Sequence, residues 1–130
     1  MTSAIYASLL AFLISWLSMN VIKKRGKHRV SMGDDGNEEL QAAIAAQSNA
    51  IEYIPIALIL LFALEYNDFN LLVVHGLGIA FVIGRVLHAR GMLLVKFKLR
   101  VLGMKVTLYT LYGLAILNLI YTPYKFLLNA

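Results

Sequence analysis

Long apolar segments alternate with short polar ones along the chain. Four apolar runs cover about residues 4–22, 38–66, 71–95 and 106–122, and only the second opens on a polar turn. The runs hold 17 to 29 residues, and a helix of about 17–25 apolar residues can cross the hydrocarbon core of a bilayer. The pattern predicts an all-α fold with one domain, residues 1–130, in which four antiparallel helices run up and down through a membrane as a bundle.

Composition supports a membrane and excludes several kinds of chemistry. The chain is 60% apolar and only 15% charged, whereas about a quarter of a soluble domain is charged. Cysteine is absent, which excludes disulfides, zinc–thiolate sites, iron–sulfur clusters and thiol nucleophiles. No metal-ligand spacing, Ser–His–Asp triad or phosphate loop is evident, so no metal is expected. The net charge of +5 is typical of basic residues that flank membrane spans, and no nucleic-acid partner is expected.

The basic residues also predict an orientation. Residues 23–29, between the first two runs, hold five lysines or arginines, and a second basic group lies between the last two runs at Lys96, Lys98, Arg100 and Lys105. The turn at residues 67–70 has none. Because basic loops stay in the cytoplasm, the first and third loops are expected there, with both termini on the opposite side.

Several residues predict local features of the helices. Asn37 is expected to begin the second helix as its N-cap, Pro55 to lie within that helix, and Pro123 to mark the end of the fourth. The first apolar run is expected to be a retained helix rather than a removed signal peptide. Close helix approach is expected at the glycines of the third helix, Gly76, Gly78 and Gly84.

Polar residues at membrane depth are the candidates for function, because a charge at the bilayer centre costs about 2.5–3.5 kcal/mol. Asn49 shares a helix face with Glu52 and Tyr53, and Arg85 shares one with His88. Folding the two helices about residues 67–70 places Glu52 level with Arg85, and Asn49 level with His88, in the cytoplasmic half. Two interpretations remain open: Glu52 and Arg85 form a buried pair that holds the helices together, or the four residues form a site.

Other polar residues in the spans carry weaker signals. On the fourth helix, Tyr109 and Tyr112 are expected near the same depth, where packing and binding roles are equally compatible with the sequence. His75 is expected to be structural, and Asn118 and Ser15 to form hydrogen bonds between helices.

The second helix carries a recognisable motif. Residues 49–55, Asn-Ala-Ile-Glu-Tyr-Ile-Pro, resemble the Asn-x-x-Glu-Tyr-x-Pro signature of the MAPEG family, membrane-associated proteins of eicosanoid and glutathione metabolism. Arg85 and His88 resemble the Arg-x-x-His or Arg-x-x-Tyr position of that family. The resemblance covers nearly the whole chain and is strongest to a short bacterial branch. It implies a bacterial inner-membrane protein, a homotrimer of four-helix subunits, and glutathione bound between neighbouring subunits near the cytoplasmic face.

The resemblance also implies which residues form the site. An arginine that activates the glutathione thiol follows the third helix in the family, and Arg100 is the nearest candidate, with Lys98 and Lys105 as rivals. The expected glutathione-binding set is Asn49, Glu52, Tyr53, Arg85, His88, Arg29, Tyr109 and Tyr112.

One departure from the family pattern bears on activity. The family usually has an arginine four residues before the signature asparagine, and this chain has Ala45. A basic contact to a glutathione carboxylate is therefore missing unless another residue replaces it, the candidates being Arg25, Arg29 and Arg90.

Three functions follow from these observations. The first is a glutathione transferase or peroxidase that acts on lipophilic electrophiles or hydroperoxides, with glutathione as co-substrate and membrane lipid around it. The second is a non-catalytic trimeric membrane protein with a degenerate glutathione site, which Ala45 favours. The third is a small transporter that uses a Glu52–Arg85 relay, for which four short helices leave little room.

Overall fold

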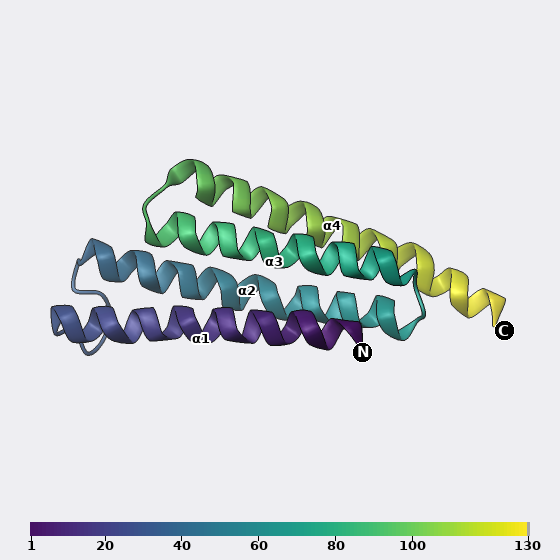
Figure 1. Ribbon diagram of the computed structural model, residues 1–130, viewed down its shortest axis with the longest axis horizontal. Coiled ribbons are helices and arrows are strands. Elements are labelled where there is room, and N and C mark those ends of the chain that lie inside the picture. Colours follow the sequence, from purple (N-terminus) through teal and green to yellow (C-terminus); the bar gives the residue numbers. More distant parts are fainter. Residues whose placement is uncertain (130) are drawn as a thin grey trace.

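Four long α-helices make up the protein, as a computed structural model shows for residues 1–129. They are α1 (Thr2–His28), α2 (Glu38–Tyr66), α3 (Leu71–Leu93) and α4 (Phe97–Leu128), and no β-strand occurs within residues 1–129. All four are long and apolar enough to cross a membrane. Successive helices run in opposite directions, as Figure 1 shows. The expected all-α class with four helices of spanning length is confirmed.

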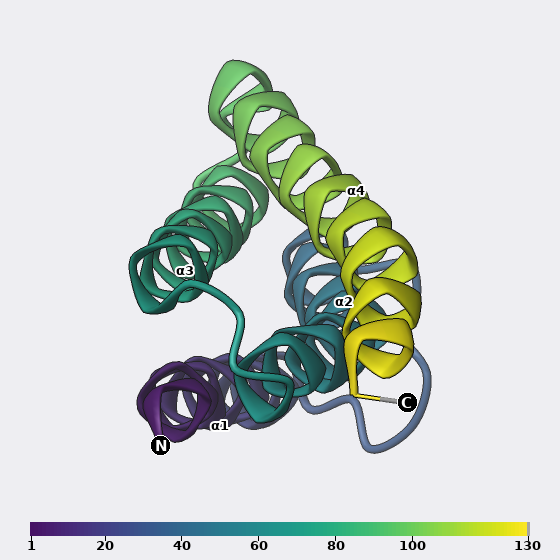
Figure 2. The same ribbon diagram turned by 90° about the vertical axis from the view of Figure 1, so that its right-hand side faces the viewer.

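The central helices of the bundle are α2 and α3. α2 packs against each of the other three helices, and α3 has its most extensive contact with α4. Within residues 1–129, α1 packs on α2 and α3 but does not contact α4, which lies across the bundle from it in Figure 2. The two helices that carry most of the polar residues at membrane depth are therefore also the two with most neighbours.

Glycines allow α3 and α4 to pack closely. A Cβ atom at Gly103 would overlap the backbone of His88, and one at Gly91 would overlap the backbone of Arg100. Gly84 faces Thr107 in the same contact, and Gly78 faces the ring of Tyr6 on α1. Close approach is thus confirmed at Gly78 and Gly84. The same expectation was wrong at Gly76, where a Cβ would meet no atom within 4 Å.

Side chains cap the starts of three helices. The Oδ1 atom of Asn37 accepts a hydrogen bond from the N–H of Leu40 at 2.9 Å, which confirms the expected start of α2. Asn70 caps α3 in the same way. At α1 the cap comes from another helix: the Glu65 carboxylate accepts from the N–H groups of Thr2 and Ser3, at 2.8 and 2.5 Å. These oxygens satisfy amide groups that have no partner inside their own helix.

The α1 helix extends beyond its expected span into the basic segment. It continues to His28, so most of that segment is helical rather than loop. Basic side chains in a last turn interact favourably with the negative end of the helix dipole. Three of them also surround the Glu39 carboxylate: Lys24 at 2.6 Å, Lys27 at 3.1 Å and His28 at 2.7 Å.

The α4 helix differs most from its expected limits. The sequence placed Lys98, Arg100 and Lys105 in the third loop. That was wrong, because α4 begins at Phe97 and all three residues lie on the helix. The α3 helix ends at Leu93, two residues before its expected end. The connection to α4 can be short because Gly91 has no side chain and lets the start of α4 pack against α3.

The other end of α4 also departs from the prediction. Pro123 lies inside α4 instead of ending it. The turns beyond this proline are held by Lys125, whose Nζ donates to the carbonyl oxygen of Asn67 at 2.5 Å and to Asp68 at 2.9 Å. Contact with the α2–α3 turn therefore offsets the hydrogen bond that proline removes.

Candidate functional site

A buried arginine lies at the centre of the polar cluster between α2 and α3. Arg85 is 1% exposed, and its Nη2 donates to Oδ1 of Asn49 at 2.5 Å. Its guanidinium carbon is 5.8 Å from the ring centre of Tyr53. Asn49 and Tyr53 are both half-buried and lie one turn apart on α2. The structure thus brings together three of the residues that the sequence singled out.

Arg85 is only partly satisfied in this position. Among residues 1–129, its Nε and Nη1 atoms have no hydrogen-bond partner, and neither does Nδ1 of the buried His88. A buried donor without a partner costs about 1–3 kcal/mol, and more when it is charged. Buried cations are normally paired with an anion. The unpaired nitrogens of Arg85 are therefore suited to an anionic group supplied by a ligand.

Glu52 does not supply that group, so the expected Glu52–Arg85 pair is wrong. Glu52 is exposed, and no carboxylate within residues 1–129 lies within 4 Å of the Arg85 guanidinium. The inward face of α2 is set by residues such as Ala50 and Ile54, which are fully buried. At about 100° per residue, Glu52 projects from the opposite side of the helix. The hairpin argument predicted how deep each residue lies in the bundle, but it could not predict the rotation of α2 about its axis, which decides where Glu52 points.

Asn49 and His88, which the sequence placed at one level, do not pair, because Asn49 bonds to Arg85, one helical turn from His88. The Nδ2 atom of Asn49 contacts the sulfur of Met104 on α4 at 3.9 Å. The backbone of His88 packs against Gly103. Sequence reasoning missed both α4 residues. Gly103 could have been found as a small residue at a helix contact, whereas nothing in the sequence marks Met104.

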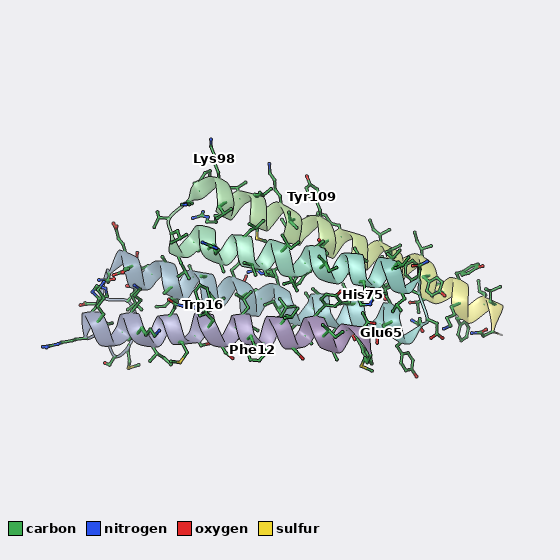
Figure 3. The ribbon with its side chains drawn as sticks, viewed as in Figure 1. Phe12, Trp16, Glu65, His75, Lys98 and Tyr109 are labelled. Carbon is green, nitrogen blue, oxygen red and sulfur yellow. The ribbon has the colours of Figure 1, made fainter. Side chains whose placement is uncertain are left out.

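The remaining predicted site residues lie on exposed surfaces. Tyr109 and Tyr112 are 70% and 57% exposed on α4, and Figure 3 shows Tyr109 pointing away from the other helices. Arg29 is exposed at the end of α1. Arg100 is exposed near the start of α4, with its guanidinium carbon 5.5 Å from the Phe97 ring centre. Among residues 1–129, none of these four side chains forms a hydrogen bond to the Arg85 cluster.

Two of the residues expected to be structural are confirmed as such. Nδ1 of His75 is 2.7 Å from the hydroxyl of Tyr6, and the two rings pack edge to face. Nδ2 of Asn118 donates to the carbonyl oxygen of Leu60 on α2 at 3.0 Å. Ser15 is exposed, and its side chain forms no hydrogen bond to any residue from 1 to 129, so that expectation was wrong.

A large groove lies elsewhere, between the ends of α1, α2 and α3 that are near the α1–α2 connection. Its volume is about 1130 Å³, and among the residues that the sequence proposed for the site only Arg90, a candidate to replace the missing arginine, lines it. Its walls include Trp16 and Lys24 of α1, Glu38 of α2 and Arg90 of α3. These residues come from three separate stretches of sequence, so no motif could reveal the groove. Arg90 lies on a different face of α3 from Arg85 and does not join the Asn49–Arg85 cluster.

Comparison with known proteins gives two findings. Residues 3–120 match the MAPEG family. The inner membrane protein YecN of Escherichia coli strain K12 is 40% identical over 125 residues, which cover 96% of this chain and 95% of that protein. The protein of the same name from Escherichia coli O6:H1 matches to the same extent.

Proposed function

The chain belongs to the MAPEG family and is an integral membrane protein, and from this premise we propose that it binds glutathione and transfers it to lipophilic electrophiles. The match to the family extends over residues 3–120 and includes both the α2 signature and the α3 pair. The proposal extends to a peroxidase reaction with lipid-soluble hydroperoxides, which uses the same thiol.

The observation that carries this proposal is the state of Arg85. It is a buried cation with two unpaired nitrogens, next to Asn49 and Tyr53. Glutathione has two carboxylates, and either one can accept a charge-assisted hydrogen bond from Nε or Nη1 of Arg85. Asn49 and Tyr53 are both half-buried, so they lie between the buried Arg85 and the exposed side of α2.

The exposed position of Glu52 supports a site shared between subunits. A carboxylate that faces lipid at this depth costs about 2.5–3.5 kcal/mol, so it is expected to be covered. A second copy of the chain against α2 covers Glu52 and leaves its carboxylate free to bind the glutathione ammonium group. Tyr109, Tyr112 and Arg100 are exposed on α4 and are available to a ligand bound between copies. We therefore propose a homotrimer, the arrangement that the family resemblance implies.

The chemistry follows from the charges. A nearby cation favours the thiolate of glutathione over the thiol. In the transferase reaction the sulfur attacks an electrophilic carbon, a carbon–sulfur bond forms, and the leaving group departs with its electron pair. Arg100 is the proposed activating cation, and it is exposed near the start of α4.

A non-catalytic role is the second candidate, and Ala45 favours it. Ala45 is exposed on the same side of α2 as Glu52, two turns nearer the start of the helix. An arginine at that position would offer a carboxylate contact that alanine lacks. If the site has decayed, the protein keeps the trimeric fold without binding glutathione.

The proposed location is the bacterial inner membrane, which agrees with the name of the Escherichia coli relative. The basic residues near the α1–α2 and α3–α4 connections favour the cytoplasmic side for both connections.

Isothermal titration of glutathione into the detergent-purified protein tests the proposal. We expect measurable binding at millimolar glutathione or below. Arg85→Met and Glu52→Gln are each expected to weaken binding at least ten-fold, because a hydrogen bond to a charged group contributes about 1.5–3 kcal/mol. Lys23→Met, exposed near the end of α1 and outside every predicted site, is the control and should bind as the unaltered protein does.

Absence of heat with the unaltered protein would reject glutathione binding. The Ala45→Arg variant then separates the two candidates. Binding restored by this arginine indicates a decayed site, and no binding in either protein removes glutathione from the function altogether.

A further inference from the structure

The groove between α1, α2 and α3 has the shape of a site for an elongated ligand. On α1 its lining runs from Leu13 to Lys24, a rise of about 16 Å along the helix. Its volume of about 1130 Å³ is slightly above the range for sites that hold drug-sized molecules, about 300–1,000 Å³. The groove therefore follows the bundle axis from the basic end of α1 toward the middle of the membrane.

The two ends of the groove differ in chemistry. The charged and amide side chains of the lining all lie toward the end near the α1–α2 connection, where Leu93, Leu94 and Val95 also line the groove: Asn20, Lys24, Asn37, Glu38, Glu39 and Arg90. Deeper in, it is apolar, with Leu13, Trp16 and Val86. Trp16 is 48% exposed and lies about 10 Å along α1 from Lys23, where the basic segment begins. Figure 3 shows its position midway along α1. A polar head and an apolar tail are what such a groove accommodates.

The charges at the polar end limit which kind of head group can bind. Lys24 is paired with Glu39 at 2.6 Å, and Glu39 also pairs with Lys27 and His28, which lie outside the groove lining. Arg90 and Glu38, by contrast, have no ion-pair partner among residues 1–129. The groove thus offers one free cation and one free anion, which is complementary to a head group with one charge of each sign.

We propose that this groove binds one phospholipid whose head group combines a phosphate diester with a primary amine, as in phosphatidylethanolamine. The phosphate binds to Arg90, and the ammonium group donates hydrogen bonds to Glu38. An acyl chain lies along Leu13, Trp16 and Val86. The site is separate from the Asn49–Arg85 cluster, and the proposal does not depend on glutathione binding.

Trp16 provides a direct measurement because it is the only tryptophan in the chain. Its fluorescence is recorded while the detergent-purified protein, without glutathione, is titrated with phospholipids that carry brominated acyl chains. Three lipids with identical chains are compared: phosphatidylethanolamine, phosphatidylcholine and phosphatidylglycerol. Because only the first has both a phosphate and an amine that donates hydrogen bonds, we expect it to give half-quenching at a mole fraction about five-fold lower than the other two.

Substitutions at Glu38 and Arg90 test which part of the lipid head group each residue contacts. Glu38→Gln should abolish the preference for phosphatidylethanolamine over phosphatidylcholine, and Arg90→Gln should weaken all three lipids about five-fold. The matched controls Asp35→Asn and Lys23→Gln remove the same charges from exposed positions at the same end of the molecule, outside the groove, and should leave quenching unchanged.

Two results overturn the proposal without any variant. Equal quenching by the three lipids shows that Trp16 reports only the surrounding detergent and lipid. A preference for phosphatidylglycerol shows that the groove selects negative charge and not a zwitterion. Control variants that change quenching as much as Glu38→Gln or Arg90→Gln reject the assigned contacts.

Discussion

Arg85 is the residue whose burial is hardest to explain by stability. It makes one hydrogen bond, to Asn49, and leaves two nitrogens unpaired among the described residues. Replacing a buried charge by an apolar side chain of similar volume is often neutral or stabilising by about 1–4 kcal/mol. A buried cation that is retained under these conditions points to a role in binding.

This argument predicts opposite effects for the two partners. Arg85→Met should leave thermal stability unchanged or raise it, because the long apolar chain fills the same space without a desolvated charge. Asn49→Ala should lower the free energy of unfolding by about 1–3 kcal/mol, because Arg85 then has no hydrogen-bond partner among residues 1–129. Thermal unfolding in detergent without glutathione measures both. Equal destabilisation by the two changes would mean that Arg85 serves mainly to hold α2 and α3 together.

Among the elements, the α3–α4 pair depends most on small residues. Gly84, Gly91 and Gly103 lie where the two helices are closest, and a Cβ at any of them would crowd the facing helix. This close contact also places Met104 against Asn49, so the packing of α4 affects the surroundings of Arg85. The packing of the α4 backbone against α3 therefore affects the candidate site.

Adding a methyl group at Gly103 tests the close contact between α3 and α4. Gly103→Ala should lower the free energy of unfolding by about 1–3 kcal/mol, because the added Cβ overlaps the backbone of His88. Gly76→Ala is the matched control on α3, since its Cβ would meet no atom within 4 Å. It should be neutral or stabilising by up to about 1 kcal/mol, because alanine favours a helix more than glycine does. Similar melting temperatures for both variants would contradict the close packing.

On the scale of the whole molecule, charges gather at the two ends of the bundle. One end has the Glu39 cluster with Lys24, Lys27 and His28. The other has the Lys125–Asp68 pair and the Glu65 cap of α1. The excess of basic residues is at the first end only, since residues 67–70 contain none. This asymmetry is the physical basis of the proposed orientation, because basic segments resist transfer across the membrane.

Cysteine labelling can test the orientation because the chain has no cysteine of its own. Met32→Cys places a thiol in the first connection, where the native side chain is 85% exposed, and Tyr66→Cys places one at the opposite end, where it is 75% exposed. In intact bacterial cells a membrane-impermeant maleimide should label Tyr66→Cys, whereas Met32→Cys should react only after the membrane is opened. The reverse pattern would invert the proposed topology.

Much of the fold could be predicted because it depends on local properties. Apolar length alone indicates four spanning helices, and the N-cap at Asn37 needs only the side chain and the next turn. The limits of α4 could not be predicted in this way. They depend on Gly91, which admits the start of α4, and on Lys125, which holds its end to the α2–α3 turn.

Three members of the candidate site were predicted, but most of its contacts were not. The motif identified Asn49, Tyr53 and Arg85, and the structure places them together. The hairpin argument placed Glu52 near the right level, but Glu52 projects from the outer side of α2. Level along a helix follows from residue number, since each residue adds a fixed rise.

The sequence by itself thus determined the class of the protein, the number of its helices and the levels at which polar residues lie. Only the tertiary structure decided which of those residues meet, because the rotation of each helix is set by how its apolar face packs against its neighbours. Packing turned Asn49 toward Arg85 and Glu52 away from it. It also assembled the groove beside Trp16 from three segments that nothing in the sequence connects.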